Sequence, residues 1–229
     1  MKTVGIIGGM SWESTSTYYK RLNQLINKRL GGLHSAEILL ASLDFAPIEE
    51  MQSKGDWDAA TQALIAKARQ LEKAGAESII IATNTMHKVA PQVEDAVKLP
   101  LLHIVDAVAE HLKQNNVNQV GLLGTRFTMQ QPFYRERLEQ QNIKVLIPGE
   151  GDGNTVDNII FKELCHGQFT DSARKQYLRI IEDLAAQGAQ GVILGCTEIG
   201  LLVQQEHSAL PLFDTTELHC RAIADWMLD

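Results

Sequence analysis

The chain has 229 residues, a formal net charge of −7 and an ordinary hydrophobic share of 45%, which together indicate a globular protein with one large or two small domains. It lacks any apolar run of about 18 residues or more, so we expect no membrane partner, and an acidic balance without a basic cluster argues against nucleic acid. Three cysteines without short spacings predict neither a disulfide framework nor a zinc site, and a cytoplasmic location follows as the expectation.

Short apolar strands alternate with helices along the chain. The expected strands are β-branched and apolar throughout, at residues 3–9, 36–43, 78–82, 99–104, 120–124, 143–147, 192–195 and 210–213. Residues 10–13 and the glycine-rich 148–154 are expected loops, and helical spacing predicts helices from Ser14 or Thr15, and at 57–73, from about 87, 106–113, 132–141, 155–165, 171–186 and 217–227. Strands without a period of two indicate parallel sheets that are covered on both faces.

The sequence contains a distant repeat of itself. The stretch IIIATNTMH at 79–87 is matched by GVILGCTE at 191–198, and each is approached by a similar glycine-containing segment. KTVGIIGG at 2–9 is likewise matched by NQVGLLGT at 118–125. In this alignment Thr83 falls on Cys196. The repeat therefore predicts one half-domain written twice.

We therefore expect an α/β fold of two pseudo-symmetric, Rossmann-like (flavodoxin-like) half-domains with parallel sheets. The first half-domain would span 1–98 plus 210–229 and carry Thr83, and the second would span 99–209 and carry Cys196. Ligands of such sheets sit beyond the carboxyl ends of the strands. The active site is accordingly expected in the cleft between the halves, bordered by the polar strand ends at Met10, Thr83, Asn84, Thr85, Thr125, Arg126, Cys196 and Thr197.

Each of these strand ends has an ordinary structural explanation beside the functional one. GIIGGM lacks the spacing of a dinucleotide fingerprint, so a tight strand-to-helix turn is the better interpretation. Asn84 and Thr85 could cap the next helix or bind the carboxylate or ammonium group of a ligand. Arg126 could form a surface ion pair or hold an anionic substrate group.

Cys196 is the strongest candidate for a reactive side chain. A cysteine is often a small buried hydrophobe, but at a strand end before a helix N-terminus the thiolate would be favoured by N–H groups and the helix dipole. A cysteine hydrolase would need a nearby histidine, for which His87, His103 and His219 are candidates. That interpretation would leave the second copy of the motif unexplained.

GIIGGM, TNTMH, GLLGT, GCTE and FDTTELH together resemble the aspartate/glutamate racemase family, which consists of cofactor-independent amino-acid racemases related to glutamate racemase. The resemblance covers the whole chain. It implies two cysteines on opposite sides of the substrate Cα, one removing a proton and the other returning one. The second family cysteine corresponds to Cys196 and the first to Thr83. The resemblance implies no cofactor and no metal, and it allows a homodimer.

Thr83 is a departure from the family pattern. A threonine hydroxyl can donate a proton but is a poor base near neutral pH. Because the C-terminal cysteine serves the L-enantiomer in related glutamate racemases, we expect Cys196 to be the base for L-substrates and the activity to be L-biased. The segments that bind an acidic side chain in the family, here Ala46–Glu49 and Leu164–His166, contain no arginine or lysine, and Cys165 occupies one such position. Arg126, Gln52 or helix N-termini would have to bind a carboxylate there, or the substrate side chain is neutral.

Two alternatives remain open. Hydantoin racemases, maleate isomerases and arylmalonate decarboxylases resemble this family, and some have one cysteine of the pair. An amino-acid-binding protein with degenerate catalysis would also fit the replacement at Thr83.

Overall fold

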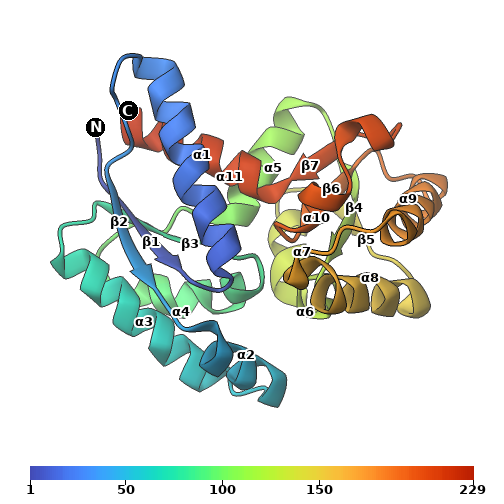
Figure 1. Ribbon diagram of the computed structural model, residues 1–229, viewed down its shortest axis with the longest axis horizontal. Coiled ribbons are helices and arrows are strands. Elements are labelled where there is room, and N and C mark those ends of the chain that lie inside the picture. The colour runs from blue at the N-terminus through green and yellow to red at the C-terminus, as the bar shows by residue number, and fades with distance from the viewer. The chain divides into compact units, whose positions relative to one another are not determined.

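The computed structural model describes residues 1–229, and the chain forms two compact units. Unit 1 contains residues 1–104 and 219–229, and unit 2 contains residues 105–218. These boundaries lie a few residues later than the expected 98/99 and 209/210, because helices α5 (Ile104–Gln114) and α11 (Thr215–Leu228) run across them (Figure 1). None of the helices combines the length and the apolar character that crossing a bilayer requires.

Unit 1 is built on a three-stranded parallel sheet in the order β2-β1-β3. The strands are β1 (Val4–Gly8), β2 (Ile38–Ser42) and β3 (Ser78–Ile81). The predicted strand at 99–104 is wrong, because pairing there is reduced to one bridge between Ile79 and Leu101 before α5 begins at Ile104.

Both faces of this sheet are covered by helices (Figure 1). Ile7, Ile79 and Ile81 pack towards one face, where the core also contains residues of α2 (Phe45–Lys54), α3 (Trp57–Lys73), η1 (Thr85–Val89) and α4 (Ala90–Asp95). Val4, Ile6 and Ile80 pack on the other face with residues of α1 (Trp12–Leu30) and α11. Strands β1 and β3 are buried at every position, which explains why they are almost wholly apolar, whereas β2 at the edge of the sheet is partly exposed.

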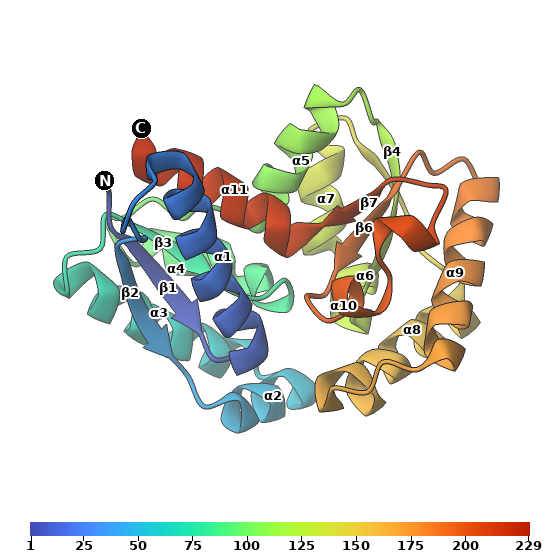
Figure 2. The same cartoon turned by 45° about the horizontal axis from the view of Figure 1, so that its top comes forward.

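Unit 2 is built on a four-stranded parallel sheet in the order β5-β4-β6-β7. Its strands are β4 (Gln119–Gly124), β5 (Lys144–Leu146), β6 (Val192–Gly195) and β7 (Leu212–Asp214). Its other helices are α6 (Arg126–Gln130), α7 (Pro132–Glu139), α8 (Glu150–Lys162), η2 (Leu164–His166), α9 (Asp171–Ala186), α10 (Ile199–Leu202) and η3 (Gln205–His207). Figure 2 shows α8 and α9 on one side of this sheet and α5 and α7 on the other. Two parallel sheets with helices on both faces confirm the predicted α/β class.

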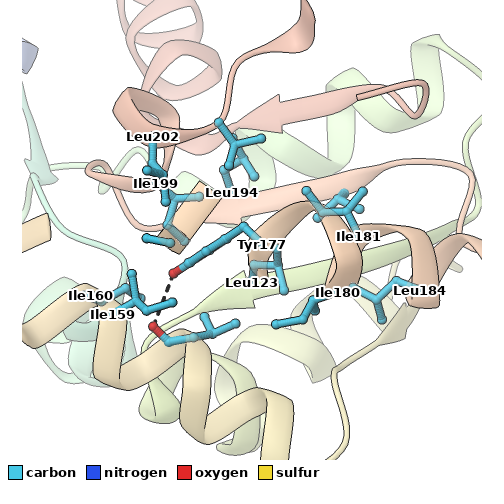
Figure 3. Close-up of a cluster of buried hydrophobic side chains, with 14 of the residues drawn as sticks. Leu123, Ile159, Ile160, Tyr177, Ile180, Ile181, Leu184, Leu194, Ile199 and Leu202 are labelled. Atoms are coloured by element: carbon cyan, nitrogen blue, oxygen red, sulfur yellow. Dashed lines mark hydrogen bonds between the residues drawn. The ribbon is translucent and has the colours of Figure 1, made fainter. Parts of the chain in front are cut away.

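A large apolar cluster fills the space between the unit 2 sheet and helices α8 and α9 (Figure 3). Tyr177 lies in its middle and donates a hydrogen bond from its hydroxyl to the carbonyl oxygen of Val156 at 3.2 Å. Leu194 and Ile199, on either side of Cys196 in the chain, belong to the same cluster. The turn that carries Cys196 is therefore anchored in the core at both ends.

The internal repeat is visible as repeated backbone geometry. Gly75 and Gly188 occupy equivalent turns with φ of 96° and 97°, a conformation that favours glycine. The backbone N–H of Thr3 donates to the Glu77 carboxylate at 2.7 Å, and that of Gln119 donates to the Gln190 amide oxygen at 3.1 Å. These pairs are equivalent in the sequence alignment, so both copies close the helix-to-strand turn in the same way.

Two expected loops are shorter than predicted. Helix α1 begins at Trp12 rather than after Ser14 or Thr15, because the Ser11 side chain caps it by accepting a hydrogen bond from the Ser14 N–H at 3.2 Å. Helix α8 begins at Glu150, inside the expected glycine-rich loop 148–154. Glu150 and Asp152 in its first turn favour a helix start, and this outweighs the neighbouring glycines.

Candidate functional site

The TNT motif of unit 1 forms the turn that follows β3. The carbonyl oxygen of Ala82 accepts a hydrogen bond from the Ser14 hydroxyl at 3.0 Å, and that of Thr83 accepts one from His87 Nδ1 at 2.8 Å. Asn84 and Thr85 are buried, and Thr83 is half-buried. Two successive carbonyl groups are thus fixed by buried side chains, which sets the course of the turn.

The hydrogen bonds of His87 define its tautomer. Its Nε2 atom accepts the backbone N–H of Ile104 at 3.3 Å, so the ring proton is on Nδ1, where the Thr83 carbonyl accepts it. The ring therefore is neutral. The rings of His103 and His219 lie 4.5 and 6.1 Å from that of His87, measured between centroids. The turn after β3 is supported by a buried histidine cluster.

The GIIGGM segment forms the other strand end of unit 1. Gly9 has a φ of 90°, and an added Cβ would lie 2.2 Å from the carbonyl oxygen of Leu43, so this turn requires glycine. The Gly9 N–H donates to the Thr15 hydroxyl at 2.8 Å, which in turn donates to the Ser11 carbonyl at 2.8 Å. The tight strand-to-helix turn is therefore the correct interpretation of this motif. Met10 packs its side chain into the core.

Gln52 reaches the TNTMH motif from helix α2. It is buried, and its Nε2 atom donates to the Met86 sulfur at 2.9 Å. The side chain of Gln52, which is predicted to bind substrate, therefore contacts the TNTMH motif at Met86.

Cys196 follows β6 in unit 2. Its side chain is half-buried, and its Sγ atom donates to Oε2 of Glu198 at 3.0 Å. Burial, and then the negative charge of Glu198, raise the pKa of the Cys196 thiol well above its usual value. The backbone N–H of Glu198 lowers this pKa, as expected of N–H groups at this turn, but burial and the Glu198 carboxylate outweigh it. The following helix α10 contains four residues, too few to outweigh burial and a carboxylate.

Thr197 and the start of α11 form a second polar group beside Cys196 in the sequence. The Thr216 hydroxyl donates to the Thr197 hydroxyl at 3.4 Å. Asp214 accepts the backbone N–H groups of Thr216 and Glu217 at 2.8 and 3.1 Å. Burial nevertheless raises the pKa of the Asp214 carboxyl above its usual value.

Thr125 and Arg126 begin helix α6 in the same unit. The Thr125 hydroxyl caps the helix by accepting the Thr128 N–H at 3.3 Å. The Arg126 backbone N–H donates to Asp157 at 2.7 Å, and its side chain is exposed. Cys165 is exposed on η2, and its charge contributes to the raised pKa of the Cys196 thiol.

The structure adds residues that the sequence patterns did not single out. Ser14 holds the carbonyl group before Thr83, Thr216 contacts Thr197, and Glu198 contacts the Cys196 sulfur. Glu198 had a signal in the sequence, since it is the last residue of the GCTE motif, but its role depends on a turn that periodicity does not reveal. Cys220, in contrast, packs in the core of unit 1.

Comparison with known proteins gives consistent matches over the chain. The family model described as Asp/Glu/Hydantoin racemase matches residues 7–223. The crystal structure of a candidate Asp/Glu racemase from Yersinia pestis is 53% identical, with a TM-score of 0.95 and 100% of both chains covered. PH1733, an aspartate racemase homologue from Pyrococcus horikoshii OT3, is 35% identical, with a TM-score of 0.89 and 100% of both chains covered. The broad specificity amino-acid racemase RacX of Bacillus subtilis is 24% identical over 93% of this chain and 92% of its own.

Proposed function

The chain belongs to the Asp/Glu/hydantoin racemase family of isomerases, and we propose that it is a cofactor-independent racemase of a small amino acid. The observation that carries the proposal is the Cys196 thiol at the carboxyl end of β6, at the position that the internal repeat relates to Thr83 at the end of β3. Racemisation consists of two mirror-related half-reactions, which a duplicated fold can serve with one group from each copy.

Cys196 is proposed as the base that removes the Cα proton of an L-amino acid. Thr83 takes the acid position on the opposite face, where its hydroxyl can donate a proton but is a poor base near neutral pH. Asn84, Thr85, Thr125 and Thr197, with nearby backbone N–H groups, are proposed to bind the substrate and stabilise the negative charge that develops at Cα. This assignment predicts activity biased towards L-substrates.

The substrate is proposed to be aspartate, glutamate or a related amino acid with a neutral side chain. The neutral choice has support from the α2 segment, where Lys54 is paired with Glu50 at 2.5 Å and Gln52 donates to Met86. RacX is named a broad specificity amino-acid racemase, which fits a substrate range that is not limited to acidic side chains. Met10, Gln52, Arg126 and Cys165 remain proposed substrate-binding residues.

The proposal is tested by incubating the protein with each L- and D-amino acid in D2O and following loss of the Cα proton by NMR. We expect exchange with at least one small amino acid, and Cys196→Ala should abolish it. Cys220→Ala is the control, because it removes a thiol that packs in the core of unit 1, and it should retain most of the exchange. A folded Cys196→Ala protein with nearly full activity would refute the mechanism.

Incubation with maleate and with an arylmalonate tests the second candidate, a related single-cysteine chemistry, which the threonine at position 83 favours. Release of CO2 or isomerisation of a double bond, without racemisation, would identify that chemistry. Binding without any exchange would identify an amino-acid-binding protein. A cytoplasmic homodimer stays a prediction, to be measured by light scattering and fractionation.

A further inference from the structure

Cys196 and Glu198 form a pair within one turn. The thiol donates to the Glu198 carboxylate at 3.0 Å, and the backbone N–H of Glu198 is hydrogen-bonded to Cys196 as well. The N–H of Ile199 donates to the Cys196 carbonyl at 3.1 Å, which closes the turn. Glu198 therefore contacts the sulfur of Cys196 through its carboxylate, which accepts a hydrogen bond, and through its backbone N–H, which donates one.

This arrangement creates a requirement for any reaction in which Cys196 acts as a base. Burial and the adjacent carboxylate keep the proton on the sulfur in the resting protein. The thiol must lose this proton before it can accept one from a substrate carbon. The group that takes the proton has to lie within hydrogen-bonding distance of the sulfur.

We propose that Glu198 is a catalytic residue that exchanges the proton with Cys196 in each turnover. In the first step the S–H proton moves to Oε2 of Glu198, which leaves a thiolate beside a neutral carboxylic acid, and the total charge of the pair does not change. In the second step the thiolate lone pair takes the Cα proton, and the electron pair of the C–H bond stays on Cα. In the reverse direction the thiol protonates Cα, and Glu198 then returns its proton to sulfur. In the forward direction Thr83 gives its proton to Cα, and after the product leaves, the partly exposed Glu198 acid loses its proton to water and Thr83 regains one from water, which restores the resting pair.

The surroundings of the pair fit this exchange. The backbone N–H of Glu198 stabilises the thiolate once it forms, and the neutral carboxylic acid can donate back to sulfur. Cys165 from η2 also raises the pKa of the Cys196 thiol, and Cys196 in turn raises the pKa of Tyr177 from α9, as do Asp157, Cys165 and Glu163. Tyr177 is held in the core by its bond to Val156, whereas Cys165 is exposed. Glu198 is thus the carboxylate that the structure places on the sulfur.

The inference rests on the proposed racemase function, and its test compares two readouts in Glu198→Gln. The first is the rate at which iodoacetamide alkylates Cys196 between pH 6 and 10, followed by mass spectrometry of the Cys196 peptide. The second is Cα–H exchange in D2O. We expect alkylation at pH 8 to become several-fold faster, because a negative charge beside the thiol is lost. We expect exchange to become ~10²–10⁴-fold slower, because the proton acceptor is lost.

A merely structural role of Glu198 would not make alkylation faster and Cα–H exchange slower in the same variant. Glu206→Gln is the matched control, because Glu206 is exposed on η3 in the same unit, and it should change neither readout. Glu198→Asp keeps the charge but withdraws it from the sulfur, and it should slow exchange without the gain in alkylation. Unchanged exchange in Glu198→Gln, or a rise in both rates, would overturn the inference. If Cys196→Ala abolishes exchange while Glu198→Gln retains it, the inference fails and the racemase function stands; if Cys196→Ala retains exchange, the racemase function itself fails.

Discussion

The Nδ1 atom of His87 lies 2.8 Å from the carbonyl oxygen of Thr83, so a buried histidine holds the residue that the repeat relates to Cys196. The other ring nitrogen of His87 accepts the N–H of Ile104. His87 thus connects the turn after β3 to the start of α5, and it acts on Thr83 through the backbone.

His87→Ala should lower both stability and turnover. The substitution removes the hydrogen bonds that the His87 ring makes with the Thr83 carbonyl and the Ile104 N–H, and leaving a buried polar group unpaired costs about 1–3 kcal/mol. We expect the free energy of unfolding in urea to fall by at least about 2 kcal/mol, and kcat to fall more than KM rises. His87→Gln should recover part of both, since its amide can donate to the carbonyl. His34→Ala is the control at an exposed histidine, with an expected change within about 0.5 kcal/mol. A His87→Ala protein with normal kcat would show that the turn does not depend on this bond.

Thr83→Cys should alter the preference between enantiomers. If Cys196 serves the L-form and the Thr83 hydroxyl is a poor base, an L-substrate should lose its Cα proton in D2O much faster than its D-enantiomer. A thiol at position 83 should raise abstraction from the D-form by ~10²-fold or more and leave the L-form nearly unchanged. Thr17→Cys, on an exposed position of α1, controls for the added thiol. Equal exchange of both enantiomers in the wild type would mean that another residue supplies the second base, with Cys165 and His87 as the first to examine.

Asp214→Asn should change how stability depends on pH. The folded state raises the Asp214 pKa, so between the usual carboxyl pKa and the raised value it binds more protons than the unfolded state. Stability in the wild type therefore falls as pH rises through this window. Asn keeps the oxygen that caps α11 but cannot ionise, so Asp214→Asn should gain relative stability at pH 7 and lose the gain at pH 4, as measured by urea unfolding. Asp56→Asn replaces an exposed N-cap of α3 and should show no such slope. The same slope in both variants would rule out burial of Asp214 as the cause.

Activity should survive exhaustive dialysis against a chelator. No group of three or more histidine, cysteine, aspartate or glutamate side chains in the chain is arranged to hold a metal ion, and the sequence has no dinucleotide fingerprint. Exchange rates before and after dialysis are therefore expected to agree. Activity that disappears and then returns with a metal ion or pyridoxal phosphate would contradict the cofactor-independent mechanism.

Strand ends and long helices could be predicted from the sequence because their signals are local. The expected helix at 57–73 and strand at 192–195 have the bounds found in the structure. Gly75 and Gly188 mark equivalent turns because a positive φ favours glycine in both copies. Local periodicity and the repeat together were thus enough for the α/β class.

The chemistry of Cys196 could not be predicted in this way. A cysteine before a helix suggests a stabilised thiolate, but the pKa depends on how deeply the turn is buried and where Glu198 directs its carboxylate. The strand predicted at 99–104 is wrong for a similar reason. Its apolar residues suggested a strand, but only Leu101 pairs with the sheet, and helix α5 already begins at Ile104. Burial and side-chain direction are tertiary properties.

The division of the chain has a consequence for the order of folding during translation. Unit 2 is one continuous segment, whereas unit 1 needs residues 219–229. Those residues supply Ile223 and Met227 to the core face that also contains Val4, and the Met227 carbonyl accepts the N–H of Lys2 at 2.9 Å. During translation, residues 1–104 of unit 1 are therefore synthesised first, and one apolar face of their sheet stays incompletely covered until unit 2 and residues 219–229 have been synthesised. The second copy of the repeat can therefore complete its core before the first, and the apolar surface that the amino-terminal part exposes in the meantime is of the kind that promotes aggregation.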